Sequence, residues 1–383
     1  MEYIEEFLKK RGEEGILRSL MPASRRVNGK IWLGERKYID LSSNDYLGLS
    51  SHPRLIAASR KALAEHGASA SASRLLSGDL EINHKLEEAT AKFKNKESAL
   101  VFNSGYQANI GIISALCGSE DAIFCDRLSH ASIIDGILLS GARIFRFRHN
   151  DADHLKALIG RERSKFTNVL IITETIFSMD GDRSDLKAIV DIKERFNCRL
   201  MVDEAHATGI YGENGSGIVE EDKLSERVDF IMGTFGKALG SFGAYLAASK
   251  SYCDYLVNRC RSFIYSTALP PAVIAASLAG ISLVKEEPFR RQGLLKSAEY
   301  LRRRLKAKGF DVRGSSQIVP VITGDNSKTV KFAQTLREKG YWVLPIRPPT
   351  VPEGEGRLRF SLTFDHGMAV VEKLLDDMSE IVD

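Results

Sequence analysis

A lysine in a glycine-containing turn, Lys237, is a candidate catalytic residue. The apolar segment 230–232 leads into Gly233-Thr234-Phe235-Gly236-Lys237, and glycine lets the backbone bend and a ligand approach closely. A lysine amine held in such a turn can be desolvated, lose its proton and form a Schiff base with a carbonyl compound. An ordinary surface lysine is the alternative, and the turn alone does not decide between them.

An acidic and imidazole-bearing string follows the neighbouring apolar segment 200–202. It reads Asp203-Glu204-Ala205-His206, the same four letters that mark a family of helicases. A nucleotide-binding protein built around this string is the rival hypothesis from a different functional class. Because the chain contains no G-x-x-x-x-G-K-[ST] phosphate loop, that rival lacks the cradle that nucleotide phosphates need. A colourless protein that bound ATP would revive it.

Three more polar groups follow expected strands. Ser104-Gly105-Tyr106 precedes a helical pattern, and the free amides of a helix N-terminus suit a phosphate, although helix capping explains Ser104 equally well. His130 could stack on a planar ligand or hydrogen-bond to it, or it could be a partly buried structural histidine. Ser178 could donate a hydroxyl hydrogen bond, or serve only turn chemistry.

Metal binding receives little support from the sequence. The string 149–154, His-Asn-Asp-Ala-Asp-His, resembles a metal cluster, but Asp151 and Asp153 also suit a turn and a helix N-cap, and no further ligands are spaced to complete a site. The five cysteines form an odd set without a C-x-x-C pair. We therefore expect reduced, buried thiols and no metal.

The elements that must position these residues alternate between strand and helix. Short apolar runs bounded by polar residues or glycine occur at 99–102, 122–124, 144–147, 169–172, 200–202, 230–232 and 244–246. Helical patterns separate most of them. This alternation predicts an α/β fold with a mainly parallel central sheet, helices on both faces and a ligand at the carboxyl ends of the strands.

The flanking segments predict three parts. An N-terminal arm, 1–45, contains an expected helix over 4–20 and a strand near 37–41. The large α/β domain, 46–275, starts with a helix from Pro53 that ends before Gly67. A smaller C-terminal α+β domain, 276–383, follows a helical stretch from Pro271. Its expected elements are a helix at 289–308, strands near 319–321 and 342–344, and a closing helix near 368–378.

Composition describes an ordinary globular chain. Of its 383 residues 43% are hydrophobic and 27% charged, and 54 Lys and Arg stand against 50 Asp and Glu without a long run of one sign. Charge therefore favours neither a nucleic-acid nor a membrane partner. The acidic segment 1–6 lacks the apolar run that is typical of a signal peptide, and the weakly polar stretch 270–284 is shorter than the roughly 18 residues that a membrane span needs. We expect a cytoplasmic protein.

Taken together, the motifs resemble those of the α-oxoamine synthases, which are fold-type I pyridoxal-phosphate enzymes. The resemblance runs almost end to end, through strings at 43–48, 104–109, 129–132, 177–182, 203–206, 234–237 and 265–271. It implies a fold-type I transferase, an acyltransferase that uses pyridoxal 5'-phosphate, and a homodimer whose active site lies at the subunit interface.

The resemblance also implies roles for the cofactor residues. Lys237 would carry the cofactor as a Schiff base and remove the Cα proton of the substrate, and Asp203 would pair with the pyridinium nitrogen. His130 would stack on the ring, while His206 and Ser178 would bond near its phenolic oxygen. The phosphate would be held by Gly105, Tyr106 and Thr234 and by Thr267 of the partner subunit.

Within the family, the strings 148–151 and 346–352 are most similar to the member of biotin biosynthesis that condenses L-alanine with a pimeloyl thioester of coenzyme A or acyl-carrier protein. A member that uses glycine and acetyl-CoA is the alternative. Arg18 could face the far carboxylate of the acyl chain, and Arg347 would bind the amino-acid carboxylate. Asn44, His130 and Thr350 complete the expected substrate set. The Ala/Ser run at 67–74 departs from the family, whose members carry more glycine there.

Overall fold

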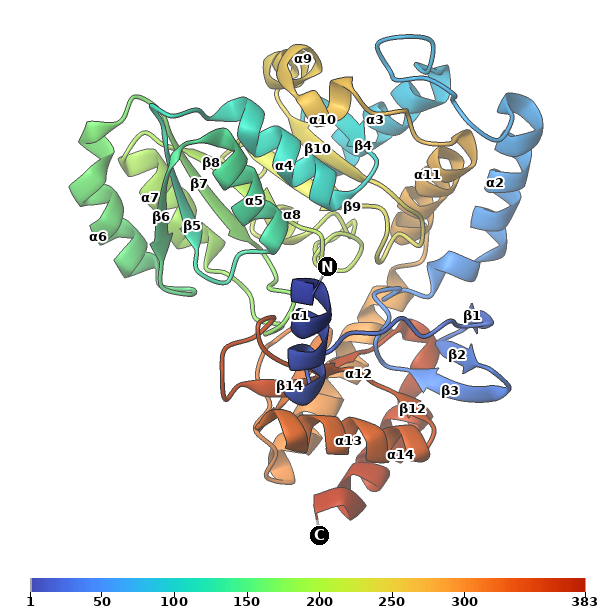
Figure 1. The fold of residues 1–383 in the computed structure, drawn as a ribbon. Helices are drawn as coiled ribbons and strands as arrows, with labels where there is room; N and C mark the ends of the chain where they lie inside the picture. Colours follow the sequence, from blue (N-terminus) through green and yellow to red (C-terminus); the bar gives the residue numbers. More distant parts are fainter. Residues whose placement is uncertain (1, 383) are drawn as a thin grey trace. The chain divides into compact units, whose positions relative to one another are not determined.

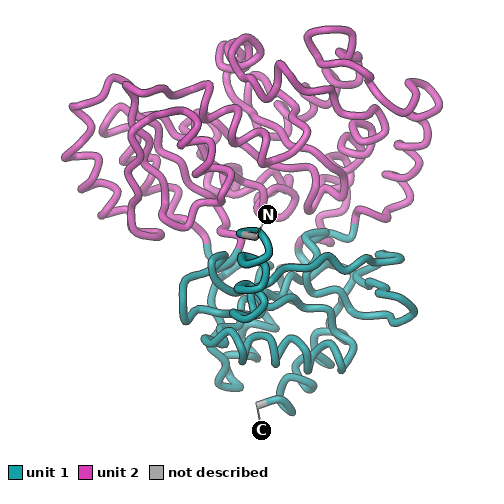
Figure 2. The backbone as a smooth tube through the Cα atoms, in the orientation of Figure 1, with its two compact units in different colours: residues 1–48, 179–182, 292–383 teal, residues 49–178, 183–291 magenta. Residues whose placement is uncertain are grey.

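The computed structural model describes residues 2–382, which divide into two compact units (Figure 2). Unit 1 comprises residues 1–48, 179–182 and 292–383, and unit 2 comprises 49–178 and 183–291. The N-terminal segment thus belongs with the C-terminal part of the chain. The whole of α11 (Pro271–Glu286) lies in unit 2, whereas the sequence placed domain boundaries at 45/46 and 275/276.

Unit 2 contains a seven-stranded sheet with the order β4-β10-β9-β8-β7-β5-β6 (Figure 1). Its strands are β4 (Ser98–Phe102), β5 (Ala122–Asp126), β6 (Arg143–Phe147), β7 (Val169–Glu174), β8 (Arg199–Asp203), β9 (Phe230–Thr234) and β10 (Ala244–Ala248). All seven expected strands are confirmed. Neighbouring strands from β6 to β9 are parallel, whereas β10 is antiparallel to both β4 and β9. The reversal follows from the connection between β9 and β10, which contains no helix and can only return antiparallel.

Helices cover both faces of this sheet (Figure 1), so its strands are buried on both sides. In β5, Ile123 and Cys125 pack in a cluster with Ile112 of α4, while Phe124 between them points to the opposite face and is also fully buried. This two-sided burial explains the continuous apolar runs. The helices of unit 2 other than α11 are α2 (Pro53–His66), α3 (Glu81–Lys94), α4 (Gly105–Leu116), α5 (Ala131–Ser140), α6 (Ala152–Glu162), α7 (Leu186–Arg195), α8 (Ile218–Glu221), α9 (Lys250–Arg259) and α10 (Arg261–Ile264), with 3-10 turns at Leu49–Ser51 and Arg163–Lys165.

Unit 1 is an α+β unit with two small sheets. One has the order β1-β2-β3-β12 and the other β11-β14-β13. Their strands are β1 (Arg25–Val27), β2 (Lys30–Leu33), β3 (Arg36–Asp40), β11 (Ile318–Gly324), β12 (Tyr341–Trp342), β13 (Pro345–Ile346) and β14 (Gly356–Ser361). The helices are α1 (Glu2–Glu13), α12 (Pro288–Ala307), α13 (Asn326–Glu338) and α14 (Gly367–Val382), with a 3-10 turn at Phe364–His366. Helix α12 starts in unit 2 and continues into unit 1.

Unit 1 differs from the sequence prediction in several elements. Helix α13 and the short strands β1, β2 and β13 were not predicted, and two further differences have a clear physical reason. The expected helix over 4–20 is wrong beyond residue 13, because Gly15 adopts a left-handed conformation (φ 65°) and residues 16–23 form no regular element. Strand β14 escaped prediction because Arg357 and Arg359 interrupt its apolar pattern. Both arginines are buried: Arg357 pairs with Asp180 Oδ1 at 2.6 Å, and Arg359 donates to Ser361 Oγ at 2.5 Å.

Two sequence-level expectations can be compared with the described residues directly. All five cysteines are free and buried, as predicted. Between residues 2 and 382, no helix combines the length and the apolar character that crossing a membrane requires.

Candidate functional site

The predicted chemistry-bearing residues of unit 2 lie at the carboxyl ends of its parallel strands. Asp203 ends β8 and Glu174 ends β7, and the two residues are register partners. Both are almost fully buried, at 6% and 3% exposure. Thr234 ends β9, one strand further. This edge is the place at which open α/β sheets bind their ligands.

A chain of hydrogen bonds joins the Asp203 carboxylate to the imidazole of His130. Asn109 Nδ2 of α4 donates to Asp203 Oδ2 at 3.0 Å and to Ser132 Oγ at 2.9 Å. Ser132 Oγ in turn lies 2.8 Å from His130 Nδ1. The second Asp203 oxygen, Oδ1, accepts from the backbone N–H of Ala205 at 2.8 Å. Asn109 Oδ1 is buried and has no hydrogen-bond partner among residues 2–382.

His130 combines the two roles that the sequence left open. It is the N-cap of α5, since its Nδ1 accepts from the backbone N–H of Ser132 at 3.3 Å. It also presents its ring at the carboxyl edge, where the ring of Tyr106 lies edge-on with centroids 6.4 Å apart. The residue keeps solvent exposure, yet the surrounding protein desolvates the imidazole and thereby lowers its pKa.

Glu174 is a buried carboxyl group that the sequence analysis missed. Its Oε1 accepts the backbone N–H of His130 at 2.7 Å. Burial raises the pKa of Glu174 well above the usual range, and the neighbouring Asp203 charge raises it further, while Lys237 acts in the opposite direction. Lys237 also lowers the pKa of His130. The Lys237 amine is therefore within electrostatic range of both groups.

Lys237 lies in the tight connection between β9 and β10. The connection is closed by bonds from Phe235 N to Gly243 O and from Ser241 N to Phe235 O, each 2.9 Å, and from Gly240 N to Lys237 O at 3.0 Å. Lys237 is half-buried, so it is neither a surface lysine nor a fully enclosed one. The hydrogen bonds of this turn fix the position of the Lys237 backbone, from which the side chain extends.

The start of α4 faces the end of β9 closely. Ser104 caps this helix by accepting from Gln107 N at 3.2 Å, which confirms the capping interpretation. A Cβ on Gly105 would lie 2.9 Å from Thr234 Cγ2, so any larger residue there would force Thr234 to move. The Thr234 hydroxyl is buried without a hydrogen-bond partner within the described chain. The first amides of a helix beside an unpaired hydroxyl form a suitable phosphate site.

The structure also places the other predicted cofactor residues. His206 is buried and directly follows Ala205, whose backbone N–H donates to Asp203. Ser178 is half-buried after β7. Thr267 is exposed; it forms an isolated bridge with Ser73. Its carbonyl oxygen accepts from Asn103 Nδ2 at 2.8 Å. The backbone of Thr267 is thus fixed by contacts within this chain, while the residue remains exposed to solvent.

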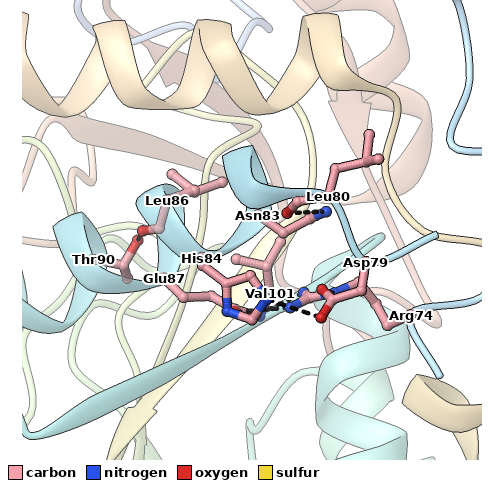
Figure 3. Close-up of polar contacts among 9 residues, drawn as sticks. All are labelled: Arg74, Asp79, Leu80, Asn83, His84, Leu86, Glu87, Thr90 and Val101. Carbon is pink, nitrogen blue, oxygen red and sulfur yellow. Dashed lines mark hydrogen bonds and ion pairs between the residues drawn. The ribbon is translucent and has the colours of Figure 1, made fainter. Parts of the chain in front are cut away.

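The Ala/Ser run at 67–74 ends in an ion-pair network at the start of α3 (Figure 3). Arg74 donates Nη1 and Nη2 to the two Glu87 oxygens at 2.8 and 2.9 Å, and Nε to Asp79 Oδ1 at 2.5 Å. Glu87 Oε1 also accepts from Val101 N of β4 at 3.1 Å. Ser71 adopts φ 57°, a left-handed conformation that glycine adopts more readily. Arg74 therefore anchors the end of a run that lacks the glycines of the family.

Glu204 follows Asp203 but belongs to a different network. Its Oε2 accepts from Lys94 Nζ of α3 at 2.7 Å, and its Oε1 accepts from Val219 N at 3.0 Å. Lys94 also donates to Thr208 Oγ1 at 3.1 Å, and that hydroxyl lies 2.8 Å from Tyr245 OH. Lys94 and Glu204 are essentially fully buried. Although burial alone would lower the pKa of Lys94, Glu204 raises it overall, so this lysine stays charged.

Four predicted substrate residues lie in unit 1, and three of them are close together. Arg18 Nη2 donates to Thr350 Oγ1 at 3.1 Å, and Arg347 donates to the carbonyl oxygen of Gly15. Desolvation and the charge of Arg18 lower the pKa of Arg347. Asn44 is separate from this group, because its Oδ1 accepts from Tyr46 OH at 3.1 Å.

The string 149–154 has a structural role. Asp151 caps α6 by accepting from His154 N at 2.7 Å, and His149 Nδ1 lies 2.9 Å from the buried Asp126 Oδ1. Asp126 Oδ2 also accepts from Asn150 N at 2.9 Å. The part of the chain that the structure describes contains no group of three His, Cys, Asp or Glu side chains able to hold a metal ion.

Sequence reasoning missed three residues that complete the carboxyl-edge site, namely Asn109, Ser132 and Glu174. A signal existed for two of them, since Asn109 and Ser132 are the last letters of the motifs at 104–109 and 129–132. Asn109 lies in the second turn of α4 and Ser132 in the first turn of α5. Both lie close to helix starts, and their bonds to Asp203 and to each other place them at the carboxyl edge.

The site fits a phosphorylated pyridine aldehyde. A buried carboxylate suits a pyridinium nitrogen, a half-buried lysine suits an aldehyde, and the Gly105–Thr234 contact with its unpaired hydroxyl suits a phosphate. These are the groups that pyridoxal phosphate requires, and unit 2 carries all of them.

Comparison with known proteins agrees with this geometry. Residues 36–377 match the family described as aminotransferase class I and II. An 8-amino-7-oxononanoate synthase of Geotalea daltonii is 47% identical over 370 residues, which cover 96% of this chain and 94% of that protein.

Two solved structures extend the comparison. A serine palmitoyltransferase of S. paucimobilis, solved with a bound PLP–myriocin aldimine, is 30% identical with a TM-score of 0.92 and covers 98% of this chain and 96% of its own. An 8-amino-7-oxononanoate synthase of Francisella tularensis is 29% identical with a TM-score of 0.79, over 90% and 98% of the two chains.

Proposed function

Because this chain belongs to the class I and II aminotransferases and, within them, to the 8-amino-7-oxononanoate synthases, we propose that it condenses L-alanine with a pimeloyl thioester in biotin biosynthesis. The products are 8-amino-7-oxononanoate, carbon dioxide and the free thiol. The carrier of the pimeloyl group is coenzyme A or acyl-carrier protein. The observation that carries this proposal is the near full-length identity of 47% to a synthase of this name, together with a carboxyl-edge site of matching chemistry.

The enzyme depends on pyridoxal 5'-phosphate, which supplies, when bound, an electron sink for the Cα of an amino acid. Lys237 would hold its aldehyde carbon, and the lysine amine, once released, would take the Cα proton of L-alanine. The Asp203 carboxylate would keep the proton on the pyridine nitrogen, because a buried carboxylate stabilises a nearby cation. Asn109 orients that carboxylate through the 3.0 Å bond.

The remaining cofactor contacts follow from position. The amides of Gly105 and Tyr106 and the hydroxyl of Thr234 would bind the phosphate, and His130 would lie on the ring face. Ser178 and His206 would donate hydrogen bonds near the phenolic oxygen.

Arg18 and Arg347 suit the two carboxylates that this substrate pair carries. Arg347 would bind the carboxylate of alanine, and Arg18 would face the far end of the pimeloyl chain. Thr350 links the two, since its hydroxyl accepts from Arg18 and its backbone N–H donates to the carbonyl oxygen of Arg347. The influence of Arg18 on the pKa of Arg347 supports this assignment, since two neighbouring cations gain from anionic ligands. Asn44 and His130 complete the proposed substrate contacts.

We further propose a cytoplasmic homodimer in which Thr267 reaches the phosphate bound by the partner subunit. Thr267 is exposed, and so are two apolar side chains near it. Tyr265, two residues before it, is 72% exposed, and Leu76, which follows the Ser73 that pairs with Thr267, is 80% exposed. Exposed apolar groups of this size commonly mark an interface. Light scattering of the purified holoenzyme measures the dimer, and a monomer would exclude it.

A competition experiment tests the reaction. The cofactor-loaded enzyme receives L-alanine and glycine together with equal concentrations of pimeloyl-CoA and acetyl-CoA, and the products are identified by mass spectrometry. We expect 8-amino-7-oxononanoate as the main product. If 2-amino-3-oxobutyrate or its breakdown product dominated, the cofactor residues would stand, but the assignments of Arg18 and of the string 346–352 would be wrong.

A further inference from the structure

The direction of each hydrogen bond between Asp203 and His130 can be derived from the chemistry of the groups. The Asn109 side-chain atom that faces Asp203 Oδ2 at 3.0 Å must be the amide nitrogen, because a carboxylate only accepts. The same nitrogen lies 2.9 Å from Ser132 Oγ. Since an amide nitrogen only donates, Ser132 Oγ is the acceptor in that contact.

Ser132 therefore keeps its own proton for another partner. That partner is His130 Nδ1 at 2.8 Å. The backbone N–H of Ser132 points at the same nitrogen at 3.3 Å. Two donors converge on Nδ1, so this nitrogen presents its lone pair, and the ring proton must be on Nε2.

We propose that Asn109 and Ser132 are positioning residues that hold His130 as a neutral imidazole with its proton on Nε2. Asn109 is 1% exposed and Ser132 is fully buried, so water does not compete for these hydrogen bonds. The backbone of His130 is fixed independently, because its N–H donates to Glu174 Oε1 at 2.7 Å.

The charged groups around the imidazole come from four elements. Asp203 of β8 and Asp135 of α5 favour the imidazolium, whereas Lys237 after β9 and desolvation oppose it, and the net effect lowers the pKa of His130. Glu174 of β7 contacts the backbone of His130. The ring is thus neutral near pH 7, in agreement with the hydrogen-bond directions.

A neutral His130 has a consequence that rests on the proposed function. It leaves the negative charge of Asp203 available to the pyridinium nitrogen, because within residues 2–382 the Asp203 carboxylate accepts from the neutral Asn109 amide and a backbone N–H and from no cation. The Nε2–H group is then the single donor of the imidazole, and it can serve a substrate carbonyl or carboxylate oxygen without adding a charge.

Nitrogen NMR of the full-length holoenzyme tests the proposal without any substrate. The protein is labelled with 15N-histidine, two-bond 1H–15N correlations are recorded at neutral pH, and the loss of one signal set in His130→Gln assigns His130. We expect the pattern of the neutral Nε2–H tautomer. A pattern of the Nδ1–H tautomer or of the imidazolium would overturn the proposal.

Two variants and one matched control test the origin of the tautomer. Ser132→Ala removes the hydroxyl donor and should admit the Nδ1–H form, whereas Ser132→Thr keeps a hydroxyl and should retain Nε2–H. Ser129→Ala is the control, because the Ser129 hydroxyl is also buried beside His130 but has no hydrogen-bond partner between residues 2 and 382. A tautomer that is identical in Ser132→Ala and wild type would show that Ser132 does not set it.

Steady-state kinetics separates this inference from the proposed function. Ser132→Ala should lower kcat about tenfold, the loss expected for one hydrogen bond that matters in the transition state, with little change in KM. Failure to form 8-amino-7-oxononanoate in the wild type would refute the proposed function and leave the tautomer result standing. Normal formation of 8-amino-7-oxononanoate together with an Nδ1–H His130 would refute the tautomer proposal and leave the proposed function standing.

Discussion

Two buried polar networks start from adjacent residues and end differently. The network of Glu204 joins Lys94, Thr208 and Tyr245, and each of these side chains has a hydrogen-bond partner. The network of Asp203 runs through Asn109 to Ser132, and buried atoms at its edge, Asn109 Oδ1 among them, have no partner in the described chain. Burial of an unpaired polar atom costs roughly 1–3 kcal/mol. The Asp203 network therefore keeps hydrogen-bonding capacity that a ligand can use, whereas the Glu204 network is satisfied within the protein.

The two networks also use lysine in opposite ways. Lys94 is buried against Glu204, which raises its pKa and keeps it a cation. A permanently charged amine cannot act as a nucleophile. Lys237 is half-buried in a turn near His130 and Glu174. A lysine that stabilises the fold and a lysine that does chemistry can therefore be told apart by the groups around them.

The largest expected effect comes from Lys237→Ala. Loss of the amine that holds the cofactor and moves the Cα proton should lower kcat at least about 10⁴-fold and remove the absorbance of lysine-bound cofactor, while stability stays close to wild type. The exposed Lys250, which pairs with Asp254, provides the control variant Lys250→Ala. A Lys237→Ala enzyme that still turned over would remove the distinction between the two lysines.

Lys94→Met should affect stability instead. It leaves the Glu204 carboxylate buried without its cation, which costs about 3–5 kcal/mol, measured as the free energy of unfolding in urea. Replacing both partners, as Lys94→Met with Glu204→Gln, should recover part of this loss. If the single and double variants were equally unstable, Glu204 would not be the reason that Lys94 is tolerated in the core.

His366 of unit 1 tests whether a buried, hydrogen-bonded imidazole lowers the stability of the fold at acidic pH. His366 Nδ1 accepts from Thr363 N at 3.2 Å, and burial lowers the pKa of its imidazole to about 4. Between pH 6.5 and 4 the unfolded chain binds a proton that the folded chain does not. His366 should therefore reduce stability by about 2–3 kcal/mol as pH falls through this range.

His366→Gln isolates this contribution, because glutamine does not titrate. Both tryptophans of the chain, Trp32 in β2 and Trp342 in β12, belong to unit 1, so their fluorescence in urea reports its unfolding. The variant should lose less stability than wild type between pH 7.5 and 4.5. An equal loss would mean that the imidazole does not stay neutral.

The smallest expected effect comes from the unpaired hydroxyl of Thr234. Thr234→Val should weaken cofactor affinity roughly tenfold, because one charge-assisted hydrogen bond is lost, with no loss of stability in the cofactor-free chain. Thr208→Val is the matched control: its hydroxyl is bonded to Lys94 and Tyr245, so it should destabilise the fold and leave cofactor affinity unchanged. Reversed results would contradict the contrast between the networks.

The sequence predicted most of the fold because its strands are buried on both faces. Apolar runs such as 169–172 and 230–232 signal a central strand whatever surrounds them. The pattern failed where polar residues are buried in pairs, as in β14, because Arg357 pairs with Asp180, which lies far away in the sequence. The end of α1 was also mispredicted. Residues 16–23 form neither helix nor strand, and the local sequence did not distinguish them from the helix that precedes them.

Prediction of the site was limited in the same way. Asp203 ends a strand, His130 caps a helix and Lys237 lies in the turn after a strand, so each follows an apolar run that the local sequence shows. Asn109 and Ser132 lie inside helices, and only their distances to Asp203 and His130 reveal what they do. Hydrogen bonds between segments far apart in sequence have no local signature, so they required the structure.

Unit 1 is assembled from the two ends of the chain, and this sets the order in which the protein can form during synthesis. Strands β1, β2 and β3 can pair with one another early, but β3 also pairs in parallel with β12, Ile39 opposite Tyr341, so one edge of β3 waits for a partner that is made among the last. The seven-stranded sheet is complete once residue 248 has emerged. Translation therefore favours a folded unit 2 that carries an N-terminal segment with an open β3 edge, and release of the finished chain is what allows unit 1 to close.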